Sequence, residues 1–324
     1  MSFNDEYLLN PENNRLTIYP IKNESIWQAY KKQQAAFWTA EELDFSKDYD
    51  HYINLNSNEQ HFIKMILAFF SSSDTIVNIN LGERFLSDIK IREANVVYTF
   101  QMMMENIHSE TYSLQIDNII KDPDEKNKLF NAVCEYECIK EKANWALKWI
   151  DSTESFAMRL IAFAIVEGVF FSGSFCSIFW LKKRNIMPGL CKSNELISRD
   201  EGMHTNFAIL LYSMINNKIE ESKVHAMFIE AVEIETKFIC ESLPCAMIGM
   251  NSELMITYIK FVADRLLFDL GYNKLFNVKN PFDFMESISI EGKTNFFESR
   301  PTQYQSASIL NKSRHNTFNF TNDF

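Results

Sequence analysis

Cysteine, glycine and proline are all scarce in this chain of 324 residues. The six cysteines form no Cys-x-x-Cys pair, which argues against both a disulfide framework and a zinc finger. Eight glycines and seven prolines leave long spans without a helix breaker. Apolar residues recur in these spans at helical spacing, whereas the alternation typical of strands is rare. The sequence therefore predicts an all-α fold.

Basic residues are also few, since 32 lysines and arginines face 43 aspartates and glutamates, for a net charge of -11. This is the wrong sign for a protein that follows a phosphate backbone, so we expect no nucleic-acid partner. The first ten residues contain acids and lack the basic and apolar start of a secretory signal. We therefore expect the protein in the cytoplasm.

One long apolar run, residues 161–180, has the length of a membrane span, and a basic stretch follows it. Glu167 lies near its middle, where an ionisable side chain would be costly in lipid. A helix buried on all sides in a large bundle has the same composition. We interpret the run as such a helix, with a membrane-spanning protein as the alternative.

The apolar spacing predicts long helices near 58–84, 91–119, 125–150, 154–183, 192–216, 221–242 and 252–270. Residues 1–40 are a mixed segment that we expect to form an N-terminal arm on a helical domain at 41–298. Residues 299–324 are polar but end with three phenylalanines, Phe318, Phe320 and Phe324. That composition predicts a flexible tail with a docking segment, although ordinary terminal fraying is the simpler alternative.

Two Glu-x-x-His motifs, Glu105/His108 and Glu201/His204, lie inside predicted helices. At this spacing the two side chains share a helix face and can bind one metal ion together. One such motif is weak evidence, because it also arises on solvated helix faces. Two of them in apolar surroundings, in a chain with six histidines, favour a metal site.

Lone acids, Asp74 and Glu167, stand in two further apolar helices. Each alone would be interpreted as a hydrogen-bonded core carboxylate. Together with the two motifs they match the ligand pattern of ferritin-like di-iron proteins, which takes one carboxylate from each of two extra helices. Carboxylates with one imidazole per ion suit iron or manganese, and we expect iron.

Tyr112 lies four residues beyond His108, on the same helix face, so a metal cluster there could oxidise it. A packed core tyrosine has the same spacing and is the alternative. Phe171 and Phe175 would keep water away from a radical, but phenylalanines at helical spacing are often simply core residues.

Five segments carry a more specific signal: Phe37–Glu42, Met104–Glu110, Phe170–Phe175, Ser193–Gly202 and Gly292–Glu298. With them, nearly the whole chain resembles the small subunit of class I ribonucleotide reductase in its eukaryotic and eukaryotic-virus form. The resemblance implies a ferritin-like helical bundle that holds two iron ions per chain. By residue, it implies that one ion is bound by Asp74, Glu105 and His108 and the other by Glu167, Glu201 and His204.

The resemblance also implies roles for four further residues. Tyr112 would carry a stable radical, formed with dioxygen, and Asp200 would hydrogen-bond to the ligand His108. Trp38 and Asp200 would begin a radical-transfer route, and Tyr304 would pass the radical onward. The radical would reach a large catalytic subunit, which reduces ribonucleotides to deoxyribonucleotides.

In such a protein the tail Phe318–Phe324 would dock on the large subunit, and the small subunit would form a homodimer. Thr321 and Asn322 depart from the family, whose tails carry an acid there. A ferritin-like protein that stores iron or scavenges oxygen is the alternative function, because it shares the ligand helices but needs neither Trp38, Tyr112 nor the tail.

Overall fold

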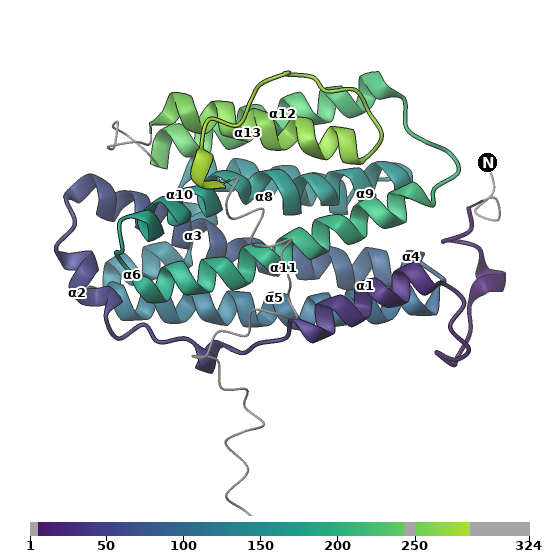
Figure 1. The fold of residues 1–324 in the computed structure, drawn as a ribbon, viewed down its shortest axis with the longest axis horizontal. Coiled ribbons are helices and arrows are strands. Elements are labelled where there is room, and N and C mark those ends of the chain that lie inside the picture. The colour runs from purple at the N-terminus through teal and green to yellow at the C-terminus, as the bar shows by residue number, and fades with distance from the viewer. Residues whose placement is uncertain (1–5, 243–250, 286–324) are drawn as a thin grey trace, which may run out of the picture. The chain divides into compact units, whose positions relative to one another are not determined.

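The computed structural model describes residues 6–242 and 251–285. Within these ranges the chain is helical with no strand, which confirms the predicted all-α fold. Residues 1–282 form one compact unit, and the second unit, 283–324, lies almost wholly outside the described residues. The predicted domain boundary at 298 and the tail therefore also lie outside them. Figure 1 shows the long helices of the first unit running alongside one another.

The longer helices are α1 (Glu24–Ala35), α3 (Ser57–Asn80), α5 (Arg92–Ile119), α8 (Glu137–Ile150), α9 (Phe156–Ile165), α10 (Ser172–Lys183), α11 (Pro188–Ser213), α12 (Glu221–Ser242) and α13 (Ser252–Asp269). Shorter ones are α2 (Asp48–Ile53), α4 (Leu86–Asp88), α6 (Pro123–Phe130) and α7 (Ala132–Glu135). Two π-helical turns, η4 (Leu81–Phe85) and η5 (Val166–Phe170), continue α3 and α9. Single π turns inside helices often occur at functional sites.

Helices α3 and α5 pack side by side and carry much of the core. At the start of α3, Asn56 and Glu59 form a capping box, in which each side chain binds the other residue's backbone N–H. Apolar side chains then follow at helical spacing, among them Phe62, Met65 and Phe69, and all are buried. This face brings the acidic residues of α3 and α5 into the interior.

The long apolar run predicted as a buried helix spans α9, η5 and α10. Two segments, Ser57–Asp88 and Phe156–Lys183, are long and apolar enough to cross a membrane. By itself this is weak evidence, since core helices pass the same test, and 94% of the apolar window of the second segment is buried inside the protein. The interpretation as a core helix therefore fits the fold.

The structure contains the short helix α2, which no predicted range covers, and it differs from the prediction in two further places. The predicted helix at 125–150 is broken into α6, α7 and α8. Its breaks fall at Asn131, whose amide binds the Asn127 carbonyl, and at Tyr136, whose ψ of 114° is extended. The predicted arm contains the helix α1, which packs against α5 and α11. Its only buried side chains are Ile26 and Gln33, so it lacks a clear apolar stripe.

Candidate metal centre

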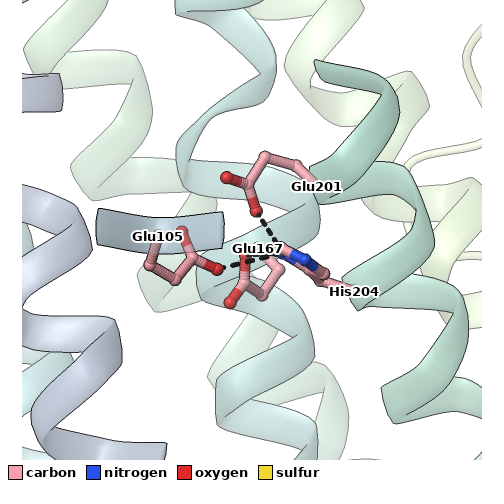
Figure 2. A group of neighbouring side chains, drawn as sticks. All are labelled: Glu105, Glu167, Glu201 and His204. Atoms are coloured by element: carbon pink, nitrogen blue, oxygen red, sulfur yellow. Dashed lines mark hydrogen bonds and ion pairs between the residues drawn. The ribbon is translucent and has the colours of Figure 1, made fainter. Parts of the chain in front are cut away.

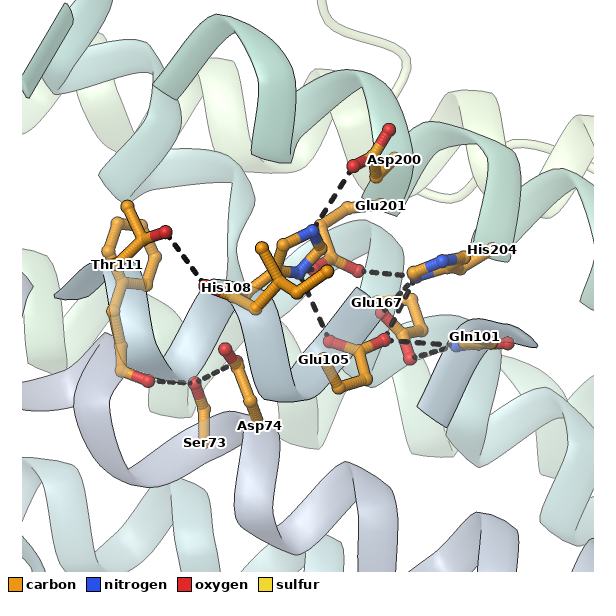
Figure 3. Close-up of polar contacts among 12 residues, drawn as sticks. Ser73, Asp74, Gln101, Glu105, His108, Thr111, Glu167, Asp200, Glu201 and His204 are labelled. Atoms are coloured by element: carbon orange, nitrogen blue, oxygen red, sulfur yellow. Dashed lines mark hydrogen bonds and ion pairs between the residues drawn. The ribbon is translucent and has the colours of Figure 1, made fainter. Parts of the chain in front are cut away.

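Six predicted ligands from four elements meet in the interior of the bundle: Asp74 of α3, Glu105 and His108 of α5, Glu167 of η5, and Glu201 and His204 of α11. None of them is more than 2% exposed. Figure 3 shows their side chains turned toward one another between the helices. Residues more than a hundred positions apart in the sequence thus share one polar cluster in an apolar core.

The ligand atoms form two groups that share Glu105. One contains Asp74, Glu105 and His108, and the other contains Glu105, Glu167, Glu201 and His204. Within each group the atoms lie within 4.8 Å of one another. Figure 2 shows the second group, with Glu105 and Glu201 both directed at the His204 ring. The arrangement offers two adjacent cation sites, with Glu105 able to contribute to both.

His108 presents one ring nitrogen to the cluster and the other to Asp200. Its Nε2 lies 3.2 Å from Asp200 Oδ2, whereas Nδ1 lies 3.3 Å from Glu105 Oε2 and 3.0 Å from Glu201 Oε1. If Nε2–H donates to the carboxylate, the Nδ1 lone pair faces acceptor oxygens. Such a contact needs a cation or a proton between the atoms, and a carboxylate behind the ring is typical of metal-bound histidine.

His204 repeats this arrangement on the other side of the cluster. Its Nδ1 lies 3.0 Å from both Glu105 Oε1 and Glu201 Oε2, and 4.0 Å from Glu167 Oε2. Burial lowers the pKa of His204, but the adjacent Glu105 and Glu201 outweigh that effect and raise its pKa to about 10. Without a metal, a proton on this ring would offset part of the acidic charge.

Burial and neighbouring acids disfavour the ionised form of two of the carboxylates. Burial, reinforced by Glu105, raises the pKa of Asp74 well above its ordinary value. Burial and the neighbouring Glu201 likewise raise the pKa of Glu167. Moreover, Asp74 Oδ2 and Glu167 Oε2 have no hydrogen-bond partner although both are buried. Divalent cations would offset the charge and bind these unpartnered oxygens, so the donor set fits a pair of such ions.

Trp38 lies directly behind His108. Its indole Nε1 donates to Asp200 Oδ2 at 2.7 Å, and its ring stacks on the His108 ring with centroids 5.9 Å apart. The other oxygen of Asp200 pairs with Arg199 at 3.0 Å. A continuous buried contact therefore runs from Trp38 through Asp200 to His108.

Tyr112 is 2% exposed, and its hydroxyl has no hydrogen-bond partner. Its ring stacks on Phe70 at 4.5 Å, and Phe70 in turn contacts Phe171 and Phe175. Burial, together with the charge of Asp74, raises the pKa of Tyr112 well above its ordinary value. The phenol is therefore neutral and shielded from water, and it lies close enough to the acidic residues for their charge to raise its pKa.

Gln101 is a site residue that sequence reasoning missed. Its amide Nε2 donates to Glu105 Oε1 at 3.3 Å and to Glu167 Oε1 at 3.1 Å, and the side chain is fully buried. The only signal was its place four residues before Glu105, on the same helix face. Tyr304 and Phe318–Phe324, also predicted to be functional, lie outside the described residues.

Comparison with known proteins gives a consistent result. The family described as "Ribonucleotide reductase, small chain" matches residues 15–281. The ribonucleoside-diphosphate reductase small chain of Nicotiana tabacum is 56% identical, over 94% of this chain and 93% of its own. The small chain of Yaba-like disease virus is 54% identical, over the whole of both chains.

Solved structures agree with this result. The ribonucleotide reductase homodimer from Saccharomyces cerevisiae has a TM-score of 0.79 at 39% identity, over 89% of this chain and 93% of its own. A ribonucleotide reductase R2 subunit from Clostridium botulinum shares the fold, with a TM-score of 0.78 at 23% identity. The predicted ferritin-like bundle is thereby confirmed.

Proposed function

This chain belongs to the ribonucleotide reductase small-chain family, and from that premise we propose that it generates and stores a tyrosyl radical at Tyr112 for a large catalytic subunit. The chain is a small subunit of ribonucleoside-diphosphate reductase, an oxidoreductase that acts together with a large subunit. The relatives give no support to the alternative of iron storage or oxygen scavenging. The observation that carries the radical proposal is the buried, unpartnered Tyr112 hydroxyl next to a six-ligand acidic cluster.

We propose that the cluster holds two iron ions, one on Asp74, Glu105 and His108 and one on Glu167, Glu201 and His204. Bound ferrous iron would supply the reduction of dioxygen and the oxidising equivalent that Tyr112 receives. Glu105 belongs to both groups of ligand atoms, so it can link the two sites. Gln101 bridges Glu105 and Glu167, because its single amide nitrogen donates a hydrogen bond to each carboxylate.

The chain's own residues prepare the site for this chemistry. Asp200 accepts a hydrogen bond from Nε2–H of His108, which leaves Nδ1 of the ring free to bind the metal. Tyr112 would give up one electron and its hydroxyl proton to the oxidised cluster, which would be reduced in the same step. Phe70, Phe171 and Phe175 exclude water around the ring, which protects the resulting radical from reduction.

Trp38 is suited to move the oxidising equivalent out of the core, because its indole is bonded to Asp200 and stacked on His108. We propose that Tyr304 continues this route and that the Phe318–Phe324 tail docks on the large subunit. The departures at Thr321 and Asn322 would affect the strength of that docking. A cytoplasmic homodimer remains our prediction.

Nucleotide reduction with an added large subunit tests this function. The whole chain should support the reaction, and a chain that ends at Glu298 should form the radical but support no reduction. A Tyr304→Phe variant should behave like the truncated chain, whereas Tyr7→Phe, at an exposed residue, should remain active. Full activity of the truncated chain would contradict the proposed role of the tail.

A further inference from the structure

A second buried charge cluster lies next to the metal centre but is separate from it. Lys142 of α8 and Glu235 of α12 are 1% and 0% exposed, and Nζ lies 2.6 Å from Glu235 Oε2. The ammonium lies over the Phe69 ring, 3.3 Å from its centroid, and 4.1 Å from that of Phe238. None of the proposed metal ligands takes part in this pair.

Such a pair is expensive to bury, because each ion loses its hydration. Burial lowers the pKa of Lys142 to about 8 and raises the pKa of Glu235 to about 7. A pair of apolar residues of similar volume would often give equal or greater stability. The charge at this position therefore calls for a role other than holding α8 and α12 together.

Its contact with the turn that carries Glu167 indicates this role. Lys142 Nζ donates to the Phe170 carbonyl at 2.7 Å, and Phe170 is the last residue of the π turn η5. On another side of the turn, a Cβ added to Gly168 would lie 3.1 Å from Leu266 and 3.2 Å from Thr205, so the backbone fits tightly there. The turn is thus held by close packing at Gly168 and by a charged hydrogen bond at Phe170.

A small cavity of about 20 Å³ lies beside the turn, and Lys142, Val166, Phe170 and Ser73 are among the residues that line it. Val166 directly precedes Glu167, so the turn has free space beside the ligand it carries. A π turn closes its hydrogen bonds between residues i and i+5, one residue further than in the α-helix around it, and such turns are frequent at functional sites.

The other end of the pair is built just as closely. A Cβ at Gly173 would come within 2.8 Å of Glu235 Oε1, so only glycine lets the α10 backbone approach this carboxylate. Glu235 therefore fixes the position of the ammonium relative to α10, and the ammonium fixes the end of η5. The pair joins five elements, α3, α8, α10, α12 and η5, at a single point.

We propose that the Lys142–Glu235 pair is a positioning device for Glu167, which sets the π turn so that this carboxylate points into the metal centre. This inference rests on the proposed metal centre. The two ions should respond differently to loss of the pair, because Glu167 belongs to only one of the two groups of ligand atoms. Losing the pair should weaken the ion held by Glu167, Glu201 and His204 and leave the ion held by Asp74, Glu105 and His108 unaffected.

The test is an anaerobic titration of the whole chain with cobalt(II). Binding is monitored by the visible d–d absorption of the bound ion, which reports the geometry of its ligands. The variant Lys142→Met with Glu235→Leu removes both charges at once. A matched control, Lys148→Met with Glu230→Leu, removes an exposed pair between the same two helices, 3.1 Å apart and 56% and 45% exposed. Melting temperatures of the metal-free proteins separate folding from positioning.

We expect the Lys142→Met, Glu235→Leu variant to bind one cobalt ion as tightly as the unaltered chain does. It should bind the other cobalt ion about tenfold more weakly, with an altered absorption band. The control should bind both ions normally. Equal weakening of both ions, or no change, would overturn the inference. If the double variant fails to fold, Lys142→Arg keeps the charge but displaces the donor to Phe170, and the same comparison decides. An unaltered chain that binds no metal would overturn the proposed function and this inference together.

Discussion

Trp38 and Asp200, 162 residues apart in the sequence, are joined by a hydrogen bond of 2.7 Å in the core. The same carboxylate oxygen lies 3.2 Å from Nε2 of His108. Asp200 is therefore positioned to orient the imidazole and to connect it to the indole. This contact links the proposed metal centre to the residue that would carry the oxidising equivalent away from it.

The variant Asp200→Asn should weaken metal binding by about ten- to a hundredfold, because the amide cannot hold the His108 ring as the carboxylate does. Ferrous iron titration under anaerobic conditions measures the change. Glu195→Gln, at a partly exposed position on the same helix, serves as the control. Unchanged affinity in Asp200→Asn would show that His108 does not depend on this carboxylate.

The variant Tyr112→Phe should bind iron normally and yield no tyrosyl radical, since the hydroxyl that is lost has no partner in the structure. Electron paramagnetic resonance after exposure to air measures the radical. Tyr98→Phe is a closely matched control, because Tyr98 lies in the same helix, is fully buried and also has an unpartnered hydroxyl. A full radical signal in Tyr112→Phe would refute the assignment.

The variant Glu105→Gln should bind iron more weakly and so make the metal-loaded protein less stable, and each kcal/mol is worth roughly 2–4 °C in melting temperature. The gain in melting temperature on adding ferrous iron should shrink, because Glu105 belongs to both groups of ligand atoms. Glu110→Gln, at an exposed position on α5, should leave that gain unchanged. A Glu105→Gln protein that gains as much in melting temperature from iron as the unaltered chain would contradict this account.

A pH effect is expected where α11 begins. Asp48 accepts hydrogen bonds from the backbone N–H groups of Gly189 and Leu190, at 2.9 and 2.7 Å. Burial outweighs these bonds and raises the pKa of Asp48 from 3.8 to about 6. The folded state therefore binds this proton more tightly than the unfolded state. The resulting stability is present below pH 3.8 and is lost as the pH rises through about 6.

It follows that the unaltered chain should lose free energy of unfolding relative to Asp48→Asn as the pH rises through about 6. Urea unfolding of the two metal-free proteins on either side of that pH measures the difference. Asp50→Asn, at an exposed position in the same helix, should show no such trend. A constant difference between Asp48→Asn and the unaltered chain would mean that Asp48 does not titrate in this range.

Much of the site could be predicted because its ligands obey helical periodicity. The spacing of Glu105 and His108 places them on one face of α5, and that helix was predicted within a residue at its start. Asp74 and Glu167 were identifiable as acids in apolar helices, because burying a carboxylate is costly unless it is paired or binds a metal. The sequence alone could not place these helices relative to one another, which is what brings the ligands together.

Other features depend on tertiary contacts and left little trace in the sequence. Gln101 is neutral, so nothing marked it as part of the centre. Lys142 and Glu235 are ordinary charged residues of two amphipathic helices, and only the packing of α8 on α12 makes them a buried pair. The breaks at Asn131 and Tyr136 arise from local backbone angles that apolar spacing does not report.

The central claim is that this chain forms a radical on Tyr112 with iron and dioxygen. The most direct measurement is electron paramagnetic resonance of the purified chain after anaerobic loading with ferrous iron and exposure to air, with the iron content determined in parallel. We predict a tyrosyl signal with about two irons per chain, as in ferritin-like di-iron centres. Iron bound without a radical would contradict the claim and point to a storage or oxidase function, and a chain that binds no iron would contradict the ligand assignment itself.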